Sequence, residues 1–230
     1  MKLLNVLSFS AILMTSVGLS QSKTLLYLDA KQPVEVRLDD LMSRMTLEEK
    51  VYQMNQFVGL DHMRQAEKNL LEEDLHSNDA QGFYKGLFSD DVAQMTREGK
   101  IGSFLHVLTT EEANLLQELA LQSPLQIPIL IGIDAIHGNA LVSGTTVYPS
   151  PISLASTWSD AFLYDVGKQS AKEMRATGSH WAFTPNIDVL RDPRWGRVGE
   201  TFGEDPFMVG NMGAAMINGF QQGDFQVQKK

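Results

Sequence analysis

The chain lacks several residues and motifs on which common protein functions depend. None of its 230 residues is cysteine, which excludes disulfide bonds, thiolate nucleophiles and zinc sites built on cysteine. The net charge is −9, and lysine and arginine cluster only at Lys229 and Lys230, so a nucleic-acid partner is not expected. The dinucleotide motif GxGxxG, the phosphate-loop motif GxxxxGK[ST] and the metal motifs HxxxH and HExxH are also absent.

Long apolar runs are missing except at the N-terminus. Residues 3–19 form an apolar stretch with five polar interruptions, preceded by Lys2 and followed by the small residue Ser20. This stretch is short and polar for a bilayer span, although a membrane anchor is the alternative. Residues 1–22 are therefore predicted to be a signal peptide. The mature chain is predicted to be exported, periplasmic or secreted, with no membrane attachment.

The remaining residues have ordinary globular composition, with 43% hydrophobic and 20% charged residues. Residues 61–90 are polar and acidic and are predicted to form a solvated insertion or a peripheral helix. Capping signals at Thr46, Thr109 and Ser159 predict the starts of three of four helices, because each side chain can accept a hydrogen bond from a backbone N–H that the first turn leaves unpaired. The predicted helices cover residues 46–56, 110–121, 159–176 and 206–220, and the predicted strands cover 101–107, 127–133 and 180–185.

Strands that alternate with capped helices indicate an α/β fold with parallel strands. A doubly wound sheet and a (β/α)8 barrel both fit this pattern. A barrel needs eight units in about 250 residues, and only three or four are visible here. The barrel interpretation is therefore a partial (β/α)8 TIM-type barrel that comprises its N-terminal portion only.

Asp134 directly follows the predicted buried strand 127–133, within the motif GIDAIHG. At the carboxyl end of a barrel strand such an acid would face the catalytic rim. The alternative is that Asp134 caps the next turn. His137 has no second histidine at metal-ligand spacing and is interpreted as structural or as supporting the site from behind.

Residues 191–206, RDPRWGRVGETFGEDP, form a loop with four acids, three arginines and one tryptophan. Arginine forks suit vicinal hydroxyls, and Trp195 or Trp181 would offer a flat ring to a sugar, the alternative for either tryptophan being a place in the core. Paired carboxylates are also what glycoside hydrolysis requires. The alternative is a surface loop held together by ion pairs.

GIDAIHG at residues 132–138, together with HWAFTPNIDVLRDPRWGRVGETFGEDP at residues 180–206, resembles the N-terminal domain of glycoside hydrolase family 3. The likeness is to its β-glucosidase branch and extends from about residue 34 to residue 224. It implies an incomplete barrel domain over residues 23–225, with residues 226–230 as a tail outside the family pattern.

The resemblance implies a retaining β-glucosidase that releases terminal β-linked glucose from β-glucosides or oligosaccharides, without cofactor or metal. It implies that Asp134 and Arg197 bind the terminal glucose, while Arg191, Asp192, Glu200, Glu204 and Asp205 frame the loop. The nucleophilic aspartate and the acid/base glutamate are expected beyond residue 230, so the chain by itself is expected to be inactive. A β-xylosidase-type member and a non-catalytic vestigial fragment are the alternatives.

Overall fold

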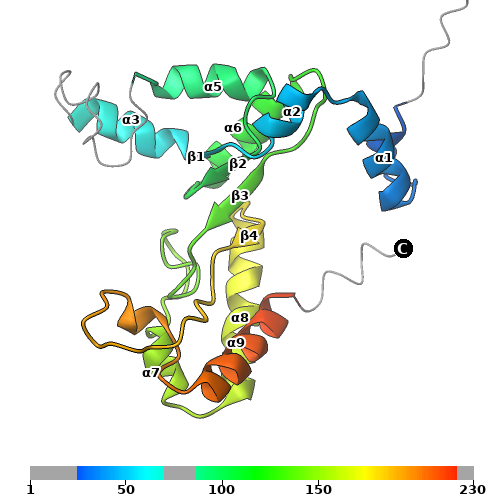
Figure 1. Ribbon diagram of the computed structural model, residues 1–230. Coiled ribbons are helices and arrows are strands. Elements are labelled where there is room, and N and C mark those ends of the chain that lie inside the picture. Colours follow the sequence, from blue (N-terminus) through cyan, green and yellow to red (C-terminus); the bar gives the residue numbers. More distant parts are fainter. Residues whose placement is uncertain (1–24, 70–85, 222–230) are drawn as a thin grey trace, which may run out of the picture. The chain divides into compact units, whose positions relative to one another are not determined.

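A computed structural model describes residues 25–69 and 86–221 of the chain (Figure 1). The chain forms two compact units, the first ending at Met45 and the second beginning at Thr46. The predicted signal peptide at residues 1–22 and the predicted tail at residues 226–230 lie outside the described residues. Both therefore stay predictions.

The first unit contains the short 3-10 helix η1 (Leu26–Leu28) and the helix α1 (Val34–Arg44). Asp40 of α1 accepts hydrogen bonds from the Tyr27 backbone N–H at 3.2 Å and from the Arg44 guanidinium at 2.8 Å. Arg37 Nε donates to the Tyr27 carbonyl at 2.9 Å. The hydrogen bond from Arg44 is the main reason that the pKa of Asp40 lies below its ordinary value. These bonds tie η1 to α1.

The second unit begins with the helix α2 (Leu47–Tyr52), which the capping box at Thr46 predicts. Thr46 Oγ1 accepts the Glu49 N–H, and the Glu49 carboxylate accepts the Thr46 N–H. The helix ends at Tyr52 rather than near residue 56, where the sequence pattern places its end. Residues Gln56–Val58 instead form strand β1, because they pair with the next strand of the sheet. Tertiary pairing here overrides the local helical pattern.

Four parallel strands form one sheet: β1, β2 (Ser103–Leu105), β3 (Leu130–Ile133) and β4 (Trp181–Ala182). Each of the last three lies inside a segment that the sequence predicts to be a strand. The strands follow one another across the sheet in chain order, with Phe57 opposite Phe104 and Phe104 opposite Ile131. A doubly wound sheet would reverse this order near its middle. The sequential order therefore favours the barrel over the doubly wound alternative.

Within residues 25–69 and 86–221, seven further helical elements connect or follow the strands. The predicted helices at residues 110–121, 159–176 and 206–220 are confirmed within one residue, whereas the short helix α7 and the 3-10 helix η2 have no counterpart in the sequence predictions. The elements are α3 (Leu60–Asn69), α5 (Ser89–Arg97), α6 (Thr110–Leu121), α7 (Pro151–Ala155), α8 (Asp160–Ala176), η2 (Val198–Glu200) and α9 (Pro206–Gln221).

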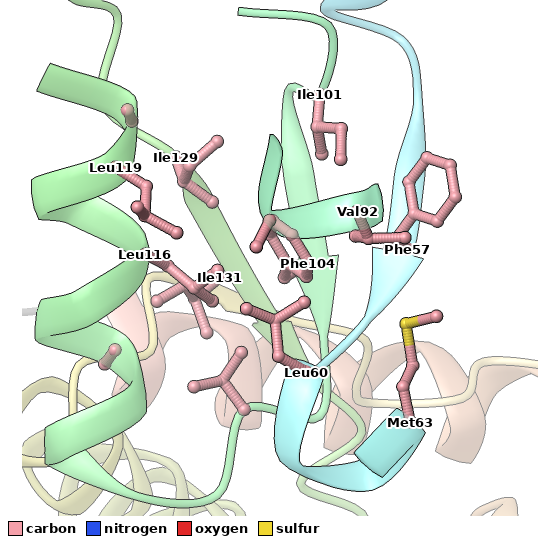
Figure 2. Close-up of a cluster of buried hydrophobic side chains, with 14 residues drawn as sticks. Phe57, Leu60, Met63, Val92, Ile101, Phe104, Leu116, Leu119, Ile129 and Ile131 are labelled. Carbon is pink, nitrogen blue, oxygen red and sulfur yellow. The ribbon is translucent and has the colours of Figure 1, made fainter. Parts of the chain in front are cut away.

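The main core lies between the sheet and the helices α3, α5 and α6 (Figure 2). Phe104 and Ile131, from neighbouring strands, point into it and are 0% and 1% exposed. Leu60 and Met63 of α3 are both fully buried in the same cluster. Of the two alternatives for residues 61–90, the solvated insertion is wrong for α3, which is a helix as the other alternative predicts and which buries Met63 in the core. Burying each such side chain contributes about 1.5–3 kcal/mol.

A second cluster joins α7, α8 and α9, and Figure 1 shows α8 and α9 side by side. Two glycines allow this close approach. A Cβ on Gly219 would collide with the Tyr164 carbonyl, and a Cβ on Gly167 would collide with the Met216 carbonyl. Gly178, with φ +93°, follows the end of α8, where a left-handed glycine commonly terminates a helix.

Candidate functional site

Asp134 lies directly after β3, at the carboxyl end of the sheet. Its Oδ2 is 2.9 Å from His106 Nε2, and its side chain is 46% exposed. Among the described residues, none of the amides of the following turn donates to this carboxylate. The turn-capping alternative for Asp134 is therefore not what the structure shows, and the carboxylate faces the rim of the sheet.

His106 occupies the equivalent place after the neighbouring strand β2. The sequence predictions missed this residue, because the predicted strand at residues 101–107 places His106 inside the strand, whereas β2 ends at Leu105. Parallel strands end at the same edge of a sheet, so polar residues that follow two neighbouring strands meet there. The pair joins the ends of β2 and β3.

Arg197 lies immediately before η2; its Nε donates to Glu200 Oε2 at 2.8 Å, and its Nη2 lies 2.6 Å from the same oxygen as an ion pair. Asn186 Nδ2 donates to the same oxygen at 2.8 Å. The pKa of Arg197 is raised, first by the Glu200 hydrogen bond and charge and then by the charges of Asp188 and Asp134. The negative charge of Asp134 is therefore near enough to favour the charged form of Arg197, although no direct contact joins the two side chains in the described structure.

The Arg197 side chain is 55% exposed. A guanidinium has five N–H donors, and only two nitrogens are engaged with Glu200. Free donors remain for a hydroxyl ligand. Asn186 and Asp188 were not among the predicted site residues, and they lie in the segment between β4 and η2.

Other charged residues of the loop at 191–206 make hydrogen bonds within the loop or with the start of α9. Arg194 pairs with Asp192 through several hydrogen bonds, which hold the pKa of Asp192 below its ordinary value. Asp205 Oδ1 accepts the Phe207 N–H at 3.0 Å and thereby caps α9. The framing interpretation fits Asp192 and Glu200 as ion pairs, whereas Asp205 serves as a helix cap.

The remaining candidates, Trp181, Trp195 and His137, lie in different surroundings. Trp181 packs against Phe183 with ring centroids 4.6 Å apart and lines a groove of about 1000 Å³ beside α8 and α9. Trp195 is half-buried in the loop, where its backbone N–H donates a hydrogen bond to the Asp192 carbonyl. His137 Nδ1 lies 3.0 Å from the Tyr148 carbonyl, which fits the structural interpretation of this residue.

Within residues 25–69 and 86–221, no group of three or more acidic or histidine side chains is arranged to hold a metal ion. No helix in the same part of the chain is both long and apolar enough to span a bilayer.

The polar side chains near the strand ends, such as His106, Asp134 and Asn186, are hydrogen-bond donors and acceptors. Such groups suit a ligand rich in hydroxyls.

Residues 46–230 match the family model of the glycosyl hydrolase family 3 N-terminal domain. The chain belongs to glycosyl hydrolase family 3. Its four sequential parallel strands are thus the N-terminal portion of a TIM-barrel-like α/β domain, as the sequence predicts. The family assignment makes the chain part of a glycosidase family.

The relatives of the chain include glucosidases and a xylosidase. It is 30% identical over 188 residues to a lysosomal β-glucosidase of Dictyostelium discoideum, covering 81% of this chain and 23% of that protein. It is 38% identical over 129 residues to a β-xylosidase of Formosa agariphila, covering 53% of this chain and 18% of that protein.

A solved structure shows the same relationship. The β-glucosidase of Listeria innocua in complex with glucose matches with a TM-score of 0.63 and 31% identity, over 82% of this chain and 24% of that one. The chain therefore spans about a quarter of the length of the first relatives that it matches.

Proposed function

We propose that this chain forms part of the terminal-glucose subsite of a retaining β-glucosidase-type glycoside hydrolase. The observation that carries the proposal is the position of Asp134, at the carboxyl end of β3 with one carboxylate oxygen unpartnered among the described residues. An exposed carboxylate oxygen accepts a sugar hydroxyl, and Arg197 nearby supplies donors. Asp134 and Arg197 are the proposed substrate-binding residues.

The proposed chemistry of the whole enzyme uses two carboxylates, one as nucleophile and one as acid and base. The residues of this chain would hold the sugar rather than break its bond. Four strands are half of an eight-stranded barrel, so the rest of the pocket is proposed to come from strands other than these four. For this reason the 230-residue chain alone is proposed to be inactive and to bind glucose weakly, with a dissociation constant above about 1 mM.

Glucose and xylose differ by the hydroxymethyl group of glucose, and the β-xylosidase relative makes a xyloside the second candidate substrate. The glucose-bound relative favours glucose, because its identity extends over a larger share of this chain. A vestigial fragment without sugar affinity is the third alternative.

Export is proposed from the N-terminal apolar run, followed by removal of residues 1–22. A lysosomal relative, which is also sorted into a compartment, supports this proposal. N-terminal sequencing of the chain recovered from its native host checks it, since a mature chain beginning near residue 23 is expected.

Two measurements on the purified chain test the proposed function. Nuclear magnetic resonance titrations with glucose and with xylose compare the two sugars at the amides around Asp134 and Arg197. Larger and more readily saturated shifts with glucose are expected, a preference for xylose favours the xylosidase alternative, and no shifts with either sugar favour the vestigial one. A chromogenic aryl β-glucoside tests turnover, and hydrolysis that disappears in Asp134→Ala would disprove the proposed inactivity.

A further inference from the structure

His106 is the residue that hydrogen-bonds the proposed sugar-binding carboxylate. A carboxylate can only accept a hydrogen bond, so the contact of 2.9 Å with Asp134 Oδ2 requires that His106 Nε2 carries the hydrogen. The imidazole is 29% exposed and the carboxylate 46% exposed. The two groups thus meet at the open rim of the sheet rather than inside the core.

The His106 backbone is fixed on both sides. Its N–H donates to the Gly132 carbonyl at 2.9 Å, which extends the pairing of β2 with β3 by one residue. Its carbonyl packs against Gly59, where an added Cβ would lie 2.9 Å from the oxygen. The backbone then turns into the left-handed region with φ +57°, which histidine tolerates better than most residues. This turn directs the ring toward the end of β3 rather than along β2.

The contact leaves the two carboxylate oxygens unequal. Oδ2 is committed to the imidazole, whereas Oδ1 has no hydrogen-bond partner among the described residues. An aspartate without such a contact would rotate about its two side-chain torsions, and a sugar would have to order it on binding. With Oδ2 held, Oδ1 is presented in one orientation.

We propose that His106 is a positioning residue that holds Asp134 through Oδ2, so that Oδ1 receives a single hydroxyl of the bound sugar. This inference rests on the proposed function, because it assigns His106 a role in the same subsite. A purely structural role, in which the pair only ties β2 to β3, predicts a different result. In that case the variants would change stability but not the affinity for a sugar.

The first arm of the test needs no sugar. In a nitrogen-15 histidine spectrum of the full chain, the His106 ring should show a protonated Nε2, and Asp134→Ala should shift or broaden that signal. Asp134→Asn serves as a second variant of similar size that keeps one acceptor oxygen. Ring signals of His106 that are unchanged in both variants would overturn the proposal, because the contact would not exist in solution.

The second arm titrates glucose into the wild-type chain, His106→Ala, His106→Gln and His137→Ala. The glutamine side chain reaches about as far as the imidazole Nε2. Alanine and glutamine are similarly strained at φ +57°, so a difference between His106→Ala and His106→Gln reports the hydrogen bond to Asp134. His106→Ala is expected to weaken binding about 2- to 10-fold, and His106→Gln should restore most of it. His137, whose ring contacts the Tyr148 carbonyl, is the control and should bind as wild type does.

The outcomes separate this inference from the proposed function. Equal affinity of wild type and His106→Ala overturns the positioning role while glucose binding stands. Absence of any glucose response in the wild-type chain counts against the proposed function instead. The first arm then decides alone whether His106 holds Asp134, and loss of the ring signal in Asp134→Ala would support it.

Discussion

The Glu112 carboxylate accepts the backbone N–H of Asp61 at 3.0 Å, although 51 residues separate the two in the chain. Glu112 lies in the first turn of α6 and is only 4% exposed, and Asp61 lies in the first turn of α3. Thr109 and Glu112 have the spacing of a capping box, which predicts that the Glu112 carboxylate accepts the backbone N–H of Thr109. That prediction is wrong, because the Thr109 hydroxyl accepts the Glu112 N–H, whereas the Glu112 carboxylate accepts an amide of the neighbouring helix α3.

The burial of Glu112 predicts a specific dependence of stability on pH. Burial, the largest cause, raises the pKa of Glu112 above its ordinary value of 4.5. The folded state therefore holds the proton more tightly than the unfolded state does. The stabilisation from this proton is complete below about pH 4.5 and is lost as the pH rises through the higher folded-state pKa.

Glu112→Gln removes this ionisation and is compared with wild type by urea unfolding across that pH window. The free energy of unfolding of the variant relative to wild type is expected to increase from acidic to neutral pH. Carboxyls such as Asp40, whose pKa is lowered, act in the opposite direction but are present in both proteins and cancel. A difference that does not vary with pH would contradict the prediction.

The contact between α8 and α9 predicts opposite effects for two glycines of α9. Gly219→Ala places a Cβ against the Tyr164 carbonyl and is expected to destabilise the chain by about 1–3 kcal/mol, since backbone cannot give way cheaply. Gly210 has no neighbour within 4 Å of its added Cβ, so Gly210→Ala should stabilise the helix by about 0.5–1 kcal/mol. Thermal unfolding of both variants checks the pair, and effects of the same sign would disprove the packing argument.

Arg197→Ala tests the second proposed sugar contact. The ion pair with Glu200 is exposed, so its loss should change the free energy of unfolding by less than about 1 kcal/mol. The glucose response should nevertheless weaken, because the free guanidinium donors are lost. Arg194→Ala is the matched control, since it removes another exposed arginine that pairs with a loop carboxylate, and it should leave the glucose response unchanged. Equal responses of the two variants would remove Arg197 from the subsite.

The strands β2, β3 and β4 and the helices α6, α8 and α9 are predictable from the sequence because their signals are local. Apolar runs mark the strands, and Thr109 and Ser159 supply capping hydroxyls that the structure confirms. Strand β1 was not predictable in this way, since Gln56–Val58 is short and is defined by its pairing with β2. The burial of Met63 likewise depends on partners far along the chain.

In the candidate site, too, the sequence reveals some residues, whereas others depend on contacts between distant parts of the chain. Asp134 stands out in the sequence because it directly follows an apolar strand, and the loop at residues 191–206 stands out because it is dense in charged residues. The contacts that orient them do not stand out, since His106 reaches Asp134 across 28 residues and Asn186 reaches Glu200 across 14. Such partners become visible only when the strand order places the ends of β2, β3 and β4 together.

A glucose titration of the wild-type chain and of Asp134→Ala tests the central claim most directly, with Asp90→Ala as the control. Asp90 is an exposed acid in the first turn of α5. We predict glucose-dependent shifts at the amides around Asp134 and Arg197 that persist in Asp90→Ala and disappear in Asp134→Ala. Shifts that persist unchanged in Asp134→Ala would contradict the assignment of Asp134 as the sugar-binding carboxylate.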